Sequence, residues 1–384
     1  MRVIGLISGT SMDAVDVAVA DLSLDGAIVV LEPVEHHEHP FPEELRTAPT
    51  SAAEVCALDT RLGRLFGAVA ARYPGDLVAS LGQTVHHWVE DGRCLGTLQL
   101  GQPAWIAEAT GLPVVADLRV RDVAAGGHGA PLASTLDALW LAGFAEEGPA
   151  VALNVGGIAN ITVVAPGEPV TAYDTGPGNA LMDAAMTVLT NGLRTHDVDG
   201  EFALRGRVHA ELLDRLLADP YYALPAPKST GKEHFNRAYL DRVTEGLVLP
   251  AEDLLATLVE LTARTVAAGC AGAGLVIGSG GGMRNPALVA ALRRHLPDLR
   301  GSDELGLPVD GKEAYLAALL GFLTWHGLPA NVPTATGASG PRLLGSITPG
   351  HEPPRLPRPV TTAITGLRIS HQRRPEDGGS RART

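Results

Sequence analysis

The sequence predicts an α/β protein built from two domains. Its 384 residues exceed what one small core needs and suit two domains of ordinary size. Short apolar runs typical of strands alternate along the chain with longer stretches of helical period, a pattern that indicates α/β layers. A strand–glycine–strand pattern opens the chain and returns near residue 150. These three observations predict two layered sheets with helices around them.

Composition limits the classes of partner. Apolar residues make up 45% of the chain and aromatic residues only 4%, so the core must be built from Ala, Val and Leu. The net charge of −13 argues against a nucleic acid or an anionic membrane bound by overall attraction. It leaves room for an anionic ligand in a local pocket of backbone N–H groups and a few basic side chains.

The cysteines and the apolar segments favour the cytoplasm. Cys56, Cys94 and Cys270 show neither metal-ligand spacing nor a disulfide framework, which fits a reducing compartment. The first twenty residues are apolar enough to suggest a signal peptide, but Asp13 and Asp16 interrupt them. No uninterrupted apolar stretch approaches the roughly 18 residues that a membrane span needs.

The first half of the chain opens with a predicted hairpin. Residues 2–8 and 14–21 read as strands, and valines at alternate positions of the second run indicate one buried face. Further elements are expected in this half. They are a helix at 52–72, a buried strand at 76–82 that ends in a Gly-Gln-Thr turn, a strand at 112–122 and a helix that begins near Pro131.

The second half repeats the opening pattern. Residues 150–164 read as strand, glycine turn and strand, which indicates a duplicated hairpin, although hairpins with glycine turns are common. Asn285-Pro286 marks a helix start, because Asn caps helices well and Pro suits the first helical position. The other expected elements are a strand at 170–174, helices at 180–189, 208–218, 251–269 and 312–326, and a strand, glycine loop and helix over 274–296.

Three glycine loops follow apolar strands: Ser8–Ser11, Gly156-Gly157 and Gly280–Gly282. Glycine lets the backbone approach a phosphate, and loop N–H groups can surround an anion. Three such loops fit a nucleotide held between two domains. Hydroxyls of the first loop can donate to phosphate oxygens, and Asp13 can hold Mg²⁺. The alternative is an ordinary turn whose Ser, Thr and Asp side chains satisfy their own backbone.

Several polar residues lie where predicted strands end. Asp174 sits at such an end, so it can act as a general base, or as a structural carboxylate that holds the "TGPGN" turn. His86 and His87 follow a buried strand end, and one of the two imidazoles is expected to face a pocket.

Two basic segments and a histidine cluster also invite functional interpretations. Arg119 and Arg121 are expected to share a strand face that binds a carboxylate or phosphate, or that forms a solvated edge. Lys228, Ser229 and Thr230, in "KSTGKEHFN" (228–236), can reach an anion or cap a helix, and capping is favoured. For the cluster His36, His37 and His39, a solvated surface is favoured over a metal site.

The motifs together resemble the anhydro-N-acetylmuramic acid kinases of bacteria, over nearly the whole chain to about residue 350. The segments that carry the resemblance are "GLISGTSMDAVDVA", "GQTVHH", "LQLGQPA", "VVADLRVRDVAAGGHGAPL", "LNVGGIANIT", "DTGPGNALMD", "KSTGKEHFN", "GGGMRNP" and "TGASGPRLLG".

The resemblance implies a two-domain actin-like ATPase (sugar kinase) fold with duplicated mixed β-sheet cores flanked by helices. The expected first domain is 1–130, completed by part of 335–350, and the second is 131–334. Residues 351–384, rich in Pro and Arg, are expected to be a disordered tail. The implied reaction converts 1,6-anhydro-N-acetylmuramic acid, water and ATP to N-acetylmuramic acid 6-phosphate during cell-wall turnover.

The resemblance also implies roles for single residues and a homodimer. Asp174 matches the family's base, which deprotonates the attacking water, and Asp13 is the metal-side carboxylate for Mg²⁺. The residues implied to bind the sugar are Arg121, Glu313, Gln83, Thr84 and His87. Those implied to border ATP are Ser8, Gly9, Thr10, Ser11, Asp13, Gly156, Gly157, Gly280, Gly281 and Gly282.

The sequence departs from the family pattern in the sugar pocket. Leu81 stands where the family usually has His, and Val120 stands within a usual run of three arginines. A kinase of the same fold for another sugar, or a sensor that binds sugar and ATP without catalysis, are the alternatives. Turnover of a sugar panel with ATP separates the three functions.

Overall fold

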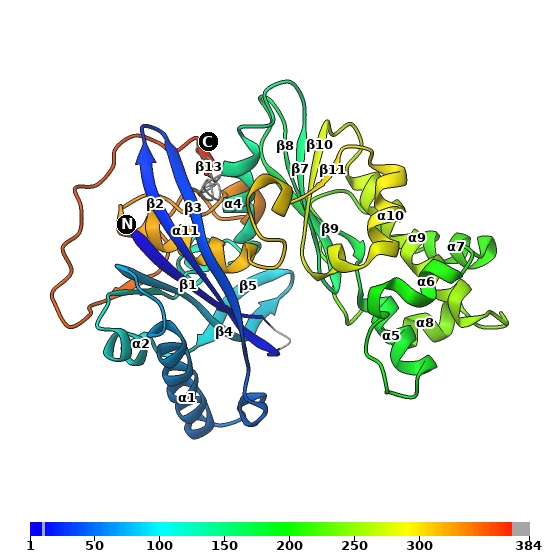
Figure 1. Ribbon diagram of the computed structural model, residues 1–384, viewed down its shortest axis with the longest axis horizontal. Helices are drawn as coiled ribbons and strands as arrows, with labels where there is room; N and C mark the ends of the chain where they lie inside the picture. The colour runs from blue at the N-terminus through cyan, green and yellow to red at the C-terminus, as the bar shows by residue number, and fades with distance from the viewer. Residues whose placement is uncertain (10–11, 371–384) are drawn as a thin grey trace, which may run out of the picture.

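The computed structural model describes residues 1–9 and 12–370, which form two β-sheets surrounded by helices (Figure 1). The first sheet has eight strands in the order β12-β6-β4-β1-β2-β3-β13, with β5 paired to β4. The strands of this sheet are β1 (Arg2–Ser8), β2 (Ala14–Asp25), β3 (Ile28–Pro40), β4 (Leu77–Glu90), β5 (Arg93–Leu100), β6 (Val114–Ala116), β12 (Ser346–Thr348) and β13 (Gly366–Ile369).

The second sheet repeats the core of the first. Its order is β11-β10-β7-β8-β9, formed by β7 (Ala150–Val155), β8 (Ile158–Val164), β9 (Thr171–Pro177), β10 (Leu275–Ser279) and β11 (Leu299–Gly301). In both sheets the first three strands are antiparallel neighbours and two later strands join parallel to the first. The predicted α/β class with duplicated mixed sheets flanked by helices is therefore confirmed.

Helices surround these sheets, and some of them form a group at the outer end of the second half (Figure 1). The α-helices are α1 (Ala52–Ala70), α2 (Pro103–Thr110), α3 (Val120–Ala124), α4 (Ala133–Leu141), α5 (Ala180–Leu189), α6 (Glu201–Arg205), α7 (Ala210–Leu217), α8 (Arg237–Val243), α9 (Ala251–Gly269), α10 (Pro286–His295), α11 (Lys312–Trp325) and α12 (Pro333–Thr336). Short 3₁₀ turns are η1 (Glu43–Leu45), η2 (Val198–Gly200), η3 (Pro220–Ala223), η4 (Gly281–Arg284) and η5 (Asp303–Leu305).

Local sequence signals explain several of these elements. Strands β1 and β2 form the predicted opening hairpin, in register Leu6 with Val17. Helix α1 begins after Ser51, whose side chain accepts from the N–H of Glu54. Helix α10 begins at Pro286, and the Asn285 side chain caps it as the sequence predicted.

The prediction of a strand over 112–122 was wrong beyond residue 116. Strand β6 covers only Val114–Ala116, and Asp117 then adopts a positive φ of 57°, which turns the chain out of the sheet. Residues 120–124 form helix α3. Arg119 and Arg121 therefore do not share a strand face. Similarly, no turn ends β4 at Gln83, because that strand continues to Glu90.

Helices α4 and α11 lie between the two sheets and join them (Figure 1). Helix α11 has buried side chains on all of its sides, which is typical of a helix inside the hydrophobic core. The backbone of α11 approaches β1 so closely that a Cβ atom at Gly5 would overlap the carbonyl oxygen of Ala314 and lie 2.7 Å from the N of Ala318. The apolar core on the opposite face of the first sheet is closed by α1 and α2.

A buried ion pair also joins the two halves. Lys312 Nζ of α11 lies 2.6 Å from Asp137 Oδ1 of α4, and both side chains are less than 9% exposed. Lys312 donates to the Ser279 hydroxyl at 3.4 Å, and Thr162 donates to Asp137 Oδ2 at 3.0 Å. Ser279 and Thr162 belong to the second sheet. The pair therefore connects the interlayer helices to that sheet.

Late segments of the chain return to the first sheet. Strand β12 pairs antiparallel with β6, and β13 pairs parallel with β3. Strand β13 lies within 351–384, for which the sequence predicted no regular structure, and residues 371–384 lie outside the described residues. The domain bounds 1–130 and 131–334 stay a prediction. Within the described residues, no helix is both long and apolar enough to cross a membrane.

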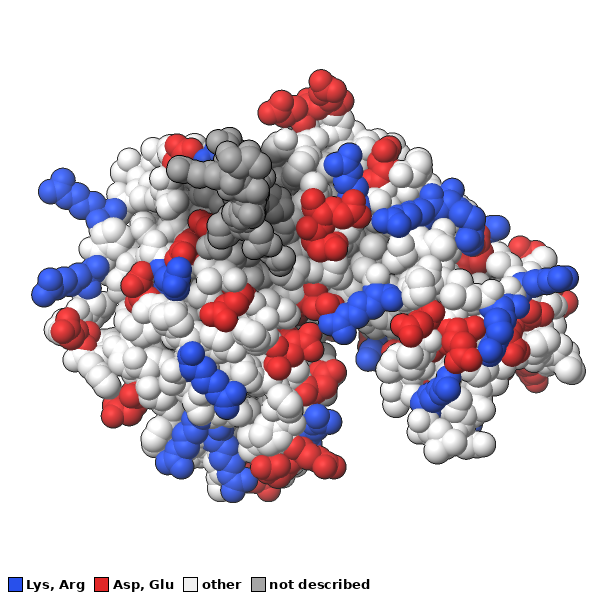
Figure 2. Space-filling model, viewed as in Figure 1, with Lys and Arg blue, Asp and Glu red and all other residues white. Residues whose placement is uncertain are grey.

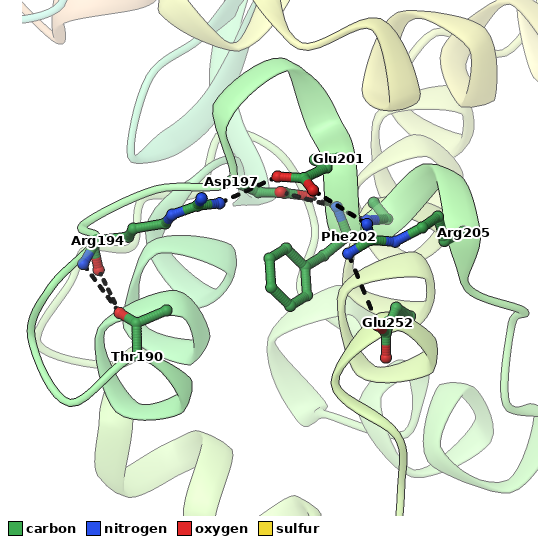
Figure 3. A network of polar contacts seen from close by, with 8 residues as sticks. Thr190, Arg194, Asp197, Glu201, Phe202, Arg205 and Glu252 are labelled. Carbon is green, nitrogen blue, oxygen red and sulfur yellow. Dashed lines mark hydrogen bonds and ion pairs between the residues drawn. The ribbon is translucent and has the colours of Figure 1, made fainter.

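Exposed ion pairs stabilise the outer end of the second half. Glu201 pairs with Arg194 and Arg205, and Arg205 also approaches Glu252 of α9 (Figure 3). The Asp197 carboxylate accepts from two N–H groups at the start of α6. Exposed ion pairs of this kind each contribute about 0–1 kcal/mol. The start of α6 is held by the Asp197 carboxylate rather than by these pairs. Charges of both signs are interspersed on the face drawn in Figure 2.

Gly5→Ala tests the close contact between β1 and α11. Overpacking at a rigid backbone contact costs about 1–3 kcal/mol or more, so the variant should lose at least that much free energy of unfolding in a denaturant titration. Gly148→Ala is the matched control, because no described atom lies within 4 Å of a Cβ atom built there. Equal stability of the two variants would contradict the contact.

Candidate active site

A cavity of about 720 Å³ lies between the two sheets, and Figure 2 shows the surface hollowed between the two halves of the molecule. Residues of both halves line it. From the first half come Ile7, Leu81, His87, Val89, Cys94, Arg119, His128 and Pro131, with Glu313 of α11; from the second come Asn154, Asn160, Tyr173, Asp174, Lys228 and Ser229. The segment 334–337 closes another side. A ligand in this cavity would contact both halves at once.

Asp174 is a half-buried carboxylate of β9 in this cavity. Its Oδ2 accepts from the Ser229 hydroxyl and from the N–H of Thr230, both at 2.9 Å. Among the described residues, no group donates to Oδ1. Burial raises the pKa of the Asp174 carboxyl above its ordinary value, while the two hydrogen bonds lower it. The carboxylate is thus oriented by one oxygen and presents the other to a ligand.

The segment 228–230 holds this carboxylate rather than a helix. Helix α8 begins at Arg237 and is capped by Asn236, so the favoured interpretation of 228–230 as a cap was wrong. Lys228 Nζ donates to the carbonyls of Tyr221 and Tyr222, each at 3.1 Å. Pairing of Ser229 with Asp174, 55 residues away in the chain, has no local sequence signal.

The first half contributes Glu313, Leu81 and His87. Glu313 lies in the first turn of α11, immediately after the buried Lys312. Leu81 is buried, so the cavity has an apolar wall at that position. The Thr97 hydroxyl and His87 Nδ1 lie 2.9 Å apart. Burial, then the charge of Arg119, lowers the pKa of His87 below its ordinary value, which favours a neutral imidazole.

Arg119, rather than Arg121, lines the cavity. Arg119 Nη1 donates to the carbonyl of Gly129 at 2.8 Å, and its buried Nε has no hydrogen-bond partner among the described residues. Glu313 is close enough to favour its charged form, against the effect of burial. Arg121 is exposed on α3 and is not among the residues that line the cavity in the described structure.

Gln83 and Thr84 lie in β4 behind the cavity wall. Gln83 is fully buried and its Nε2 donates to the carbonyl of Thr84 at 3.1 Å. The Thr84 hydroxyl accepts from Gln99 of β5. Neither residue is among those that line the cavity in the described part of the chain. These contacts stabilise the β4–β5 pair, and the expected binding of sugar by Gln83 and Thr84 stays a prediction.

The hydroxyl-rich hairpin is described only in part. The Ser8 hydroxyl donates to the carbonyl of Ala14 at 3.2 Å, so it closes the hairpin from within. The carbonyl of Gly9 accepts from the N–H of Met12, whose φ is 54°. Thr10 and Ser11 lie outside the described residues. Asp13 is exposed at the start of β2.

Carboxylates gather beside this hairpin. Asp16 of β2 is partly buried. Burial, together with the charges of Glu38, Glu313, Asp13 and Asp310, raises the pKa of its carboxyl to about 7. Such a negative field, built from carboxylate oxygens, fits a divalent cation such as Mg²⁺. In the sequence, Asp16 stands out only as an interruption of an apolar run.

His36 also belongs to this region. Asp16, His36 and Glu38 each offer a ligand atom within 4.8 Å of the others. The favoured interpretation of His36 as part of a solvated surface therefore misses its contact with β2, although His37 is half-exposed. Arg284 of η4 bridges this group to the second half, because it pairs with Glu38 at 3.4 Å and with Asp310.

The two later glycine loops lie side by side. Strand β10 pairs with β7, and a Cβ atom at Gly280 would lie 2.9 Å from the carbonyl oxygen of Val155. Gly280 has a φ of 85°, which only glycine adopts readily. The carbonyls of Gly156 and Gly157 accept from N–H groups at the start of α5. The two loops form one glycine-lined edge of the second sheet.

Comparison with known proteins adds sequence relatives. A family model described as anhydro-N-acetylmuramic acid kinase matches residues 1–350. An anhydro-N-acetylmuramic acid kinase of Streptomyces avermitilis is 57% identical over 377 residues, covering 93% of this chain and 97% of the relative. One of Rhodococcus erythropolis is 49% identical, with coverage of 96% and 99%.

Similarity to solved structures is more distant. The activator of 2-hydroxyisocaproyl-CoA dehydratase from Clostridium difficile has a TM-score of 0.41 and 13% identity, covering 84% of this chain and 94% of that chain. A glucokinase from Streptomyces griseus has a TM-score of 0.36 and 13% identity, covering 84% and 99%. At such scores these similarities add nothing to the description of the site.

Ser229→Ala tests how Asp174 is held. Loss of a hydrogen bond to the ionised carboxylate removes a stabilisation of the charged form, so the pKa of Asp174 should rise. A carboxyl ¹³C NMR titration, assigned with Asp174→Asn, measures the shift. Ser51→Ala, at the cap of α1, should leave the Asp174 titration unchanged. An unchanged pKa in Ser229→Ala would mean that this hydroxyl does not hold the carboxylate in solution.

Proposed function

The chain belongs to the anhydro-N-acetylmuramic acid kinase family, and on that premise we propose how its cleft performs the reaction. The enzyme converts 1,6-anhydro-N-acetylmuramic acid and water to N-acetylmuramic acid 6-phosphate, with ATP as phosphoryl donor, in peptidoglycan recycling. Two bonds must change: the C1–O6 bridge opens, and O6 gains the γ-phosphoryl group. The single observation that carries the mechanism is the anchored carboxylate of Asp174 in the cavity.

Asp174 is the general base. A water that donates to Oδ1 loses its proton to that oxygen while its own oxygen attacks C1 of the sugar. Support comes from the two hydrogen bonds to Oδ2, which keep the carboxylate oriented and favour its ionised form against burial. The raised pKa strengthens the base, provided that the group remains ionised at the working pH.

The departing oxygen takes the phosphoryl group. As the C1–O6 bond breaks, its electron pair stays on O6, and O6 attacks the γ-phosphorus of ATP. The bond from that phosphorus to the bridging oxygen of ADP breaks, and ADP leaves with the electron pair. Cleavage of an acetal otherwise needs an acid that protonates the departing oxygen. Here the new bond from O6 to phosphorus takes up the charge on O6, so the reaction needs no acid at that oxygen.

Arg119 and Glu313 orient the sugar. The lactyl group of the substrate carries a carboxylate, and the buried Arg119 guanidinium has an Nε–H with no partner in the described part of the chain. A guanidinium binds a carboxylate through two parallel hydrogen bonds. Glu313, across the cavity from Asp174, can accept from a sugar hydroxyl. Arg121, Gln83, Thr84 and His87 remain proposals from the family resemblance.

The nucleotide lies along the glycine loops and the first hairpin. Backbone N–H groups of Gly9 and of the Gly156-Gly157 and Gly280–Gly282 loops are the proposed phosphate donors. Asp13 is the proposed metal-side residue, and Asp16 adds to the negative field there. When bound, Mg²⁺ would neutralise phosphate charge. The phosphate site is supported by its backbone N–H groups, and the Mg²⁺ site is supported by its carboxylate oxygens.

Two further proposals concern the oligomeric state and the location of the enzyme. A homodimer follows from the family resemblance alone. A cytoplasmic location is supported by the use of ATP and by the three free cysteines, of which Cys94 and Cys270 are buried.

Asp174→Asn tests the base. The variant should bind ATP like the parent protein, but release of ADP in the presence of the anhydro sugar should fall by about 10²–10⁴-fold. A coupled assay measures ADP, and the product mass from the parent protein should show addition of both water and a phosphoryl group. Asp241→Asn, an exposed aspartate of α8, is the matched control and should retain full turnover. Normal turnover by Asp174→Asn would remove Asp174 from this role.

A matched pair of arginine variants tests the sugar carboxylate site. Arg119→Lys keeps the charge but loses the planar fork, so KM for the anhydro sugar should rise about tenfold while KM for ATP stays the same. Arg121→Lys, which alters an exposed side chain, should change KM for the sugar by less than about twofold. A larger effect at Arg121 than at Arg119 would locate the carboxylate at α3 instead.

A further inference from the structure

Lys232 lies directly over the Gly156-Gly157 loop. A Cβ atom at Gly157 would overlap Lys232 Cε and lie 3.3 Å from Lys232 Nζ, so the end of the lysine side chain packs against the backbone of this glycine. Lys232 itself is exposed and follows the segment 228–230 that holds Asp174. The lysine therefore stands at the glycine loop with its charged end accessible to a ligand.

The charge of Lys232 is not neutralised by a close partner. Among the described residues, its Nζ takes part in no hydrogen bond and no ion pair. Its charge acts on Asp183 of α5, whose pKa burial raises to about 6 while Lys232 and His196 lower it. Lys232 and Asp183 form no ion pair, since Lys232 Nζ lies more than 4 Å from the Asp183 carboxylate oxygens.

Other cations around the cleft are already engaged. Their partners are carboxylates or carbonyls: Lys312 with Asp137, Arg284 with Asp310 and Glu38, and Lys228 with the carbonyls of Tyr221 and Tyr222. Arg119 lines the cavity between the two sheets, and its Nη1 donates to the carbonyl of Gly129. Within the described part of the chain, Lys232 thus differs from them because its ammonium, at a glycine loop, has no hydrogen-bond or ion-pair partner.

We propose that Lys232 binds the β- and γ-phosphates of ATP at the Gly156-Gly157 loop. The segment from Ser229 to Lys232 spans the distance from the base to this loop, so it connects the proposed sugar site to the proposed phosphate site. A lysine ammonium is a compact point charge that binds phosphate oxygens. This inference rests on the proposed function, because ATP must lie along that loop.

The segment 228–232 places the lysine and the residues that hold the base in one motif. Ser229 and Thr230 hold Asp174 from one end of the segment, while Lys232 reaches Gly157 from the other. An ATP molecule that engages Lys232 would order the same loop that orients the base. Binding of phosphate and positioning of the carboxylate would therefore be linked through five consecutive residues, 228–232.

Isothermal titration calorimetry without sugar tests the proposal. Lys232→Ala should weaken ATP binding about tenfold or more, whereas binding of AMP, which lacks the β- and γ-phosphates, should change less than about twofold. Lys232→Arg keeps a cation and should recover most of the ATP affinity. Arg237→Ala, which removes an exposed cation of α8, is the matched control and should bind ATP like the parent protein.

Three results would overturn the proposal: unchanged ATP affinity in Lys232→Ala, an equal loss for AMP and ATP, or no recovery in Lys232→Arg. A lowered melting temperature with unchanged ATP affinity would instead assign Lys232 to the neighbourhood of Asp183. Because sugar is absent, these results do not depend on whether Asp174 is the base. Failure of the proposed mechanism and failure of this inference are therefore measured separately.

Discussion

The buried ion pair between Lys312 and Asp137 is the constraint on which the cleft depends. Removal of both charges from water costs several kcal/mol per ion, and only close geometry with further hydrogen bonds offsets that cost. Ser279 and Thr162 supply those bonds from the second sheet. The pair is consequently stable only when α4, α11 and the second sheet meet in one arrangement. Because α11 also packs against β1, that arrangement fixes the two sheets across the cavity.

The chemistry of the cavity follows from this arrangement. Glu313 comes directly after Lys312, so the anchored lysine sets where that carboxylate enters the cavity from the first turn of α11. Asp174 enters from the opposite sheet, oriented by Ser229 and Thr230. A sugar between the two would meet a base on one side and an acceptor on the other. Catalysis by positioned groups depends on such fixed geometry, because an orientation set before binding costs nothing at the transition state.

Local signals in the sequence predicted much of the fold. The alternating valines of β2 and the Asn285-Pro286 cap each act within a few residues, and both predictions are confirmed. The repeated hairpin correctly indicated a duplicated sheet. The strand predicted over 112–122 ended early because Asp117 takes a positive φ, which an apolar pattern does not reveal. Strand β13 is stabilised by pairing with β3, more than three hundred residues earlier.

The candidate site was less predictable, because it depends on contacts between distant segments. Asp174 was indicated by its place at the end of a predicted strand and Glu313 by the family resemblance alone, and both line the cavity. The hydroxyl that donates to Asp174 belongs to Ser229, which is distant in the chain. The arginine that lines the cavity is Arg119, which comes shortly after β6 ends. Asp16 draws its raised pKa from carboxylates of other elements, so no pattern within β2 could indicate it.

Oxygen isotope labelling tests the central claim, that water attacks C1 while O6 accepts the phosphoryl group. The reaction is run in H₂¹⁸O and quenched before the anomeric oxygen exchanges with solvent. Fragment masses of N-acetylmuramic acid 6-phosphate should show one ¹⁸O atom on C1 and none in the phosphate ester. Label in the C6–O–P bridge or in the phosphate group would contradict the account, because water would then have attacked carbon 6 or phosphorus.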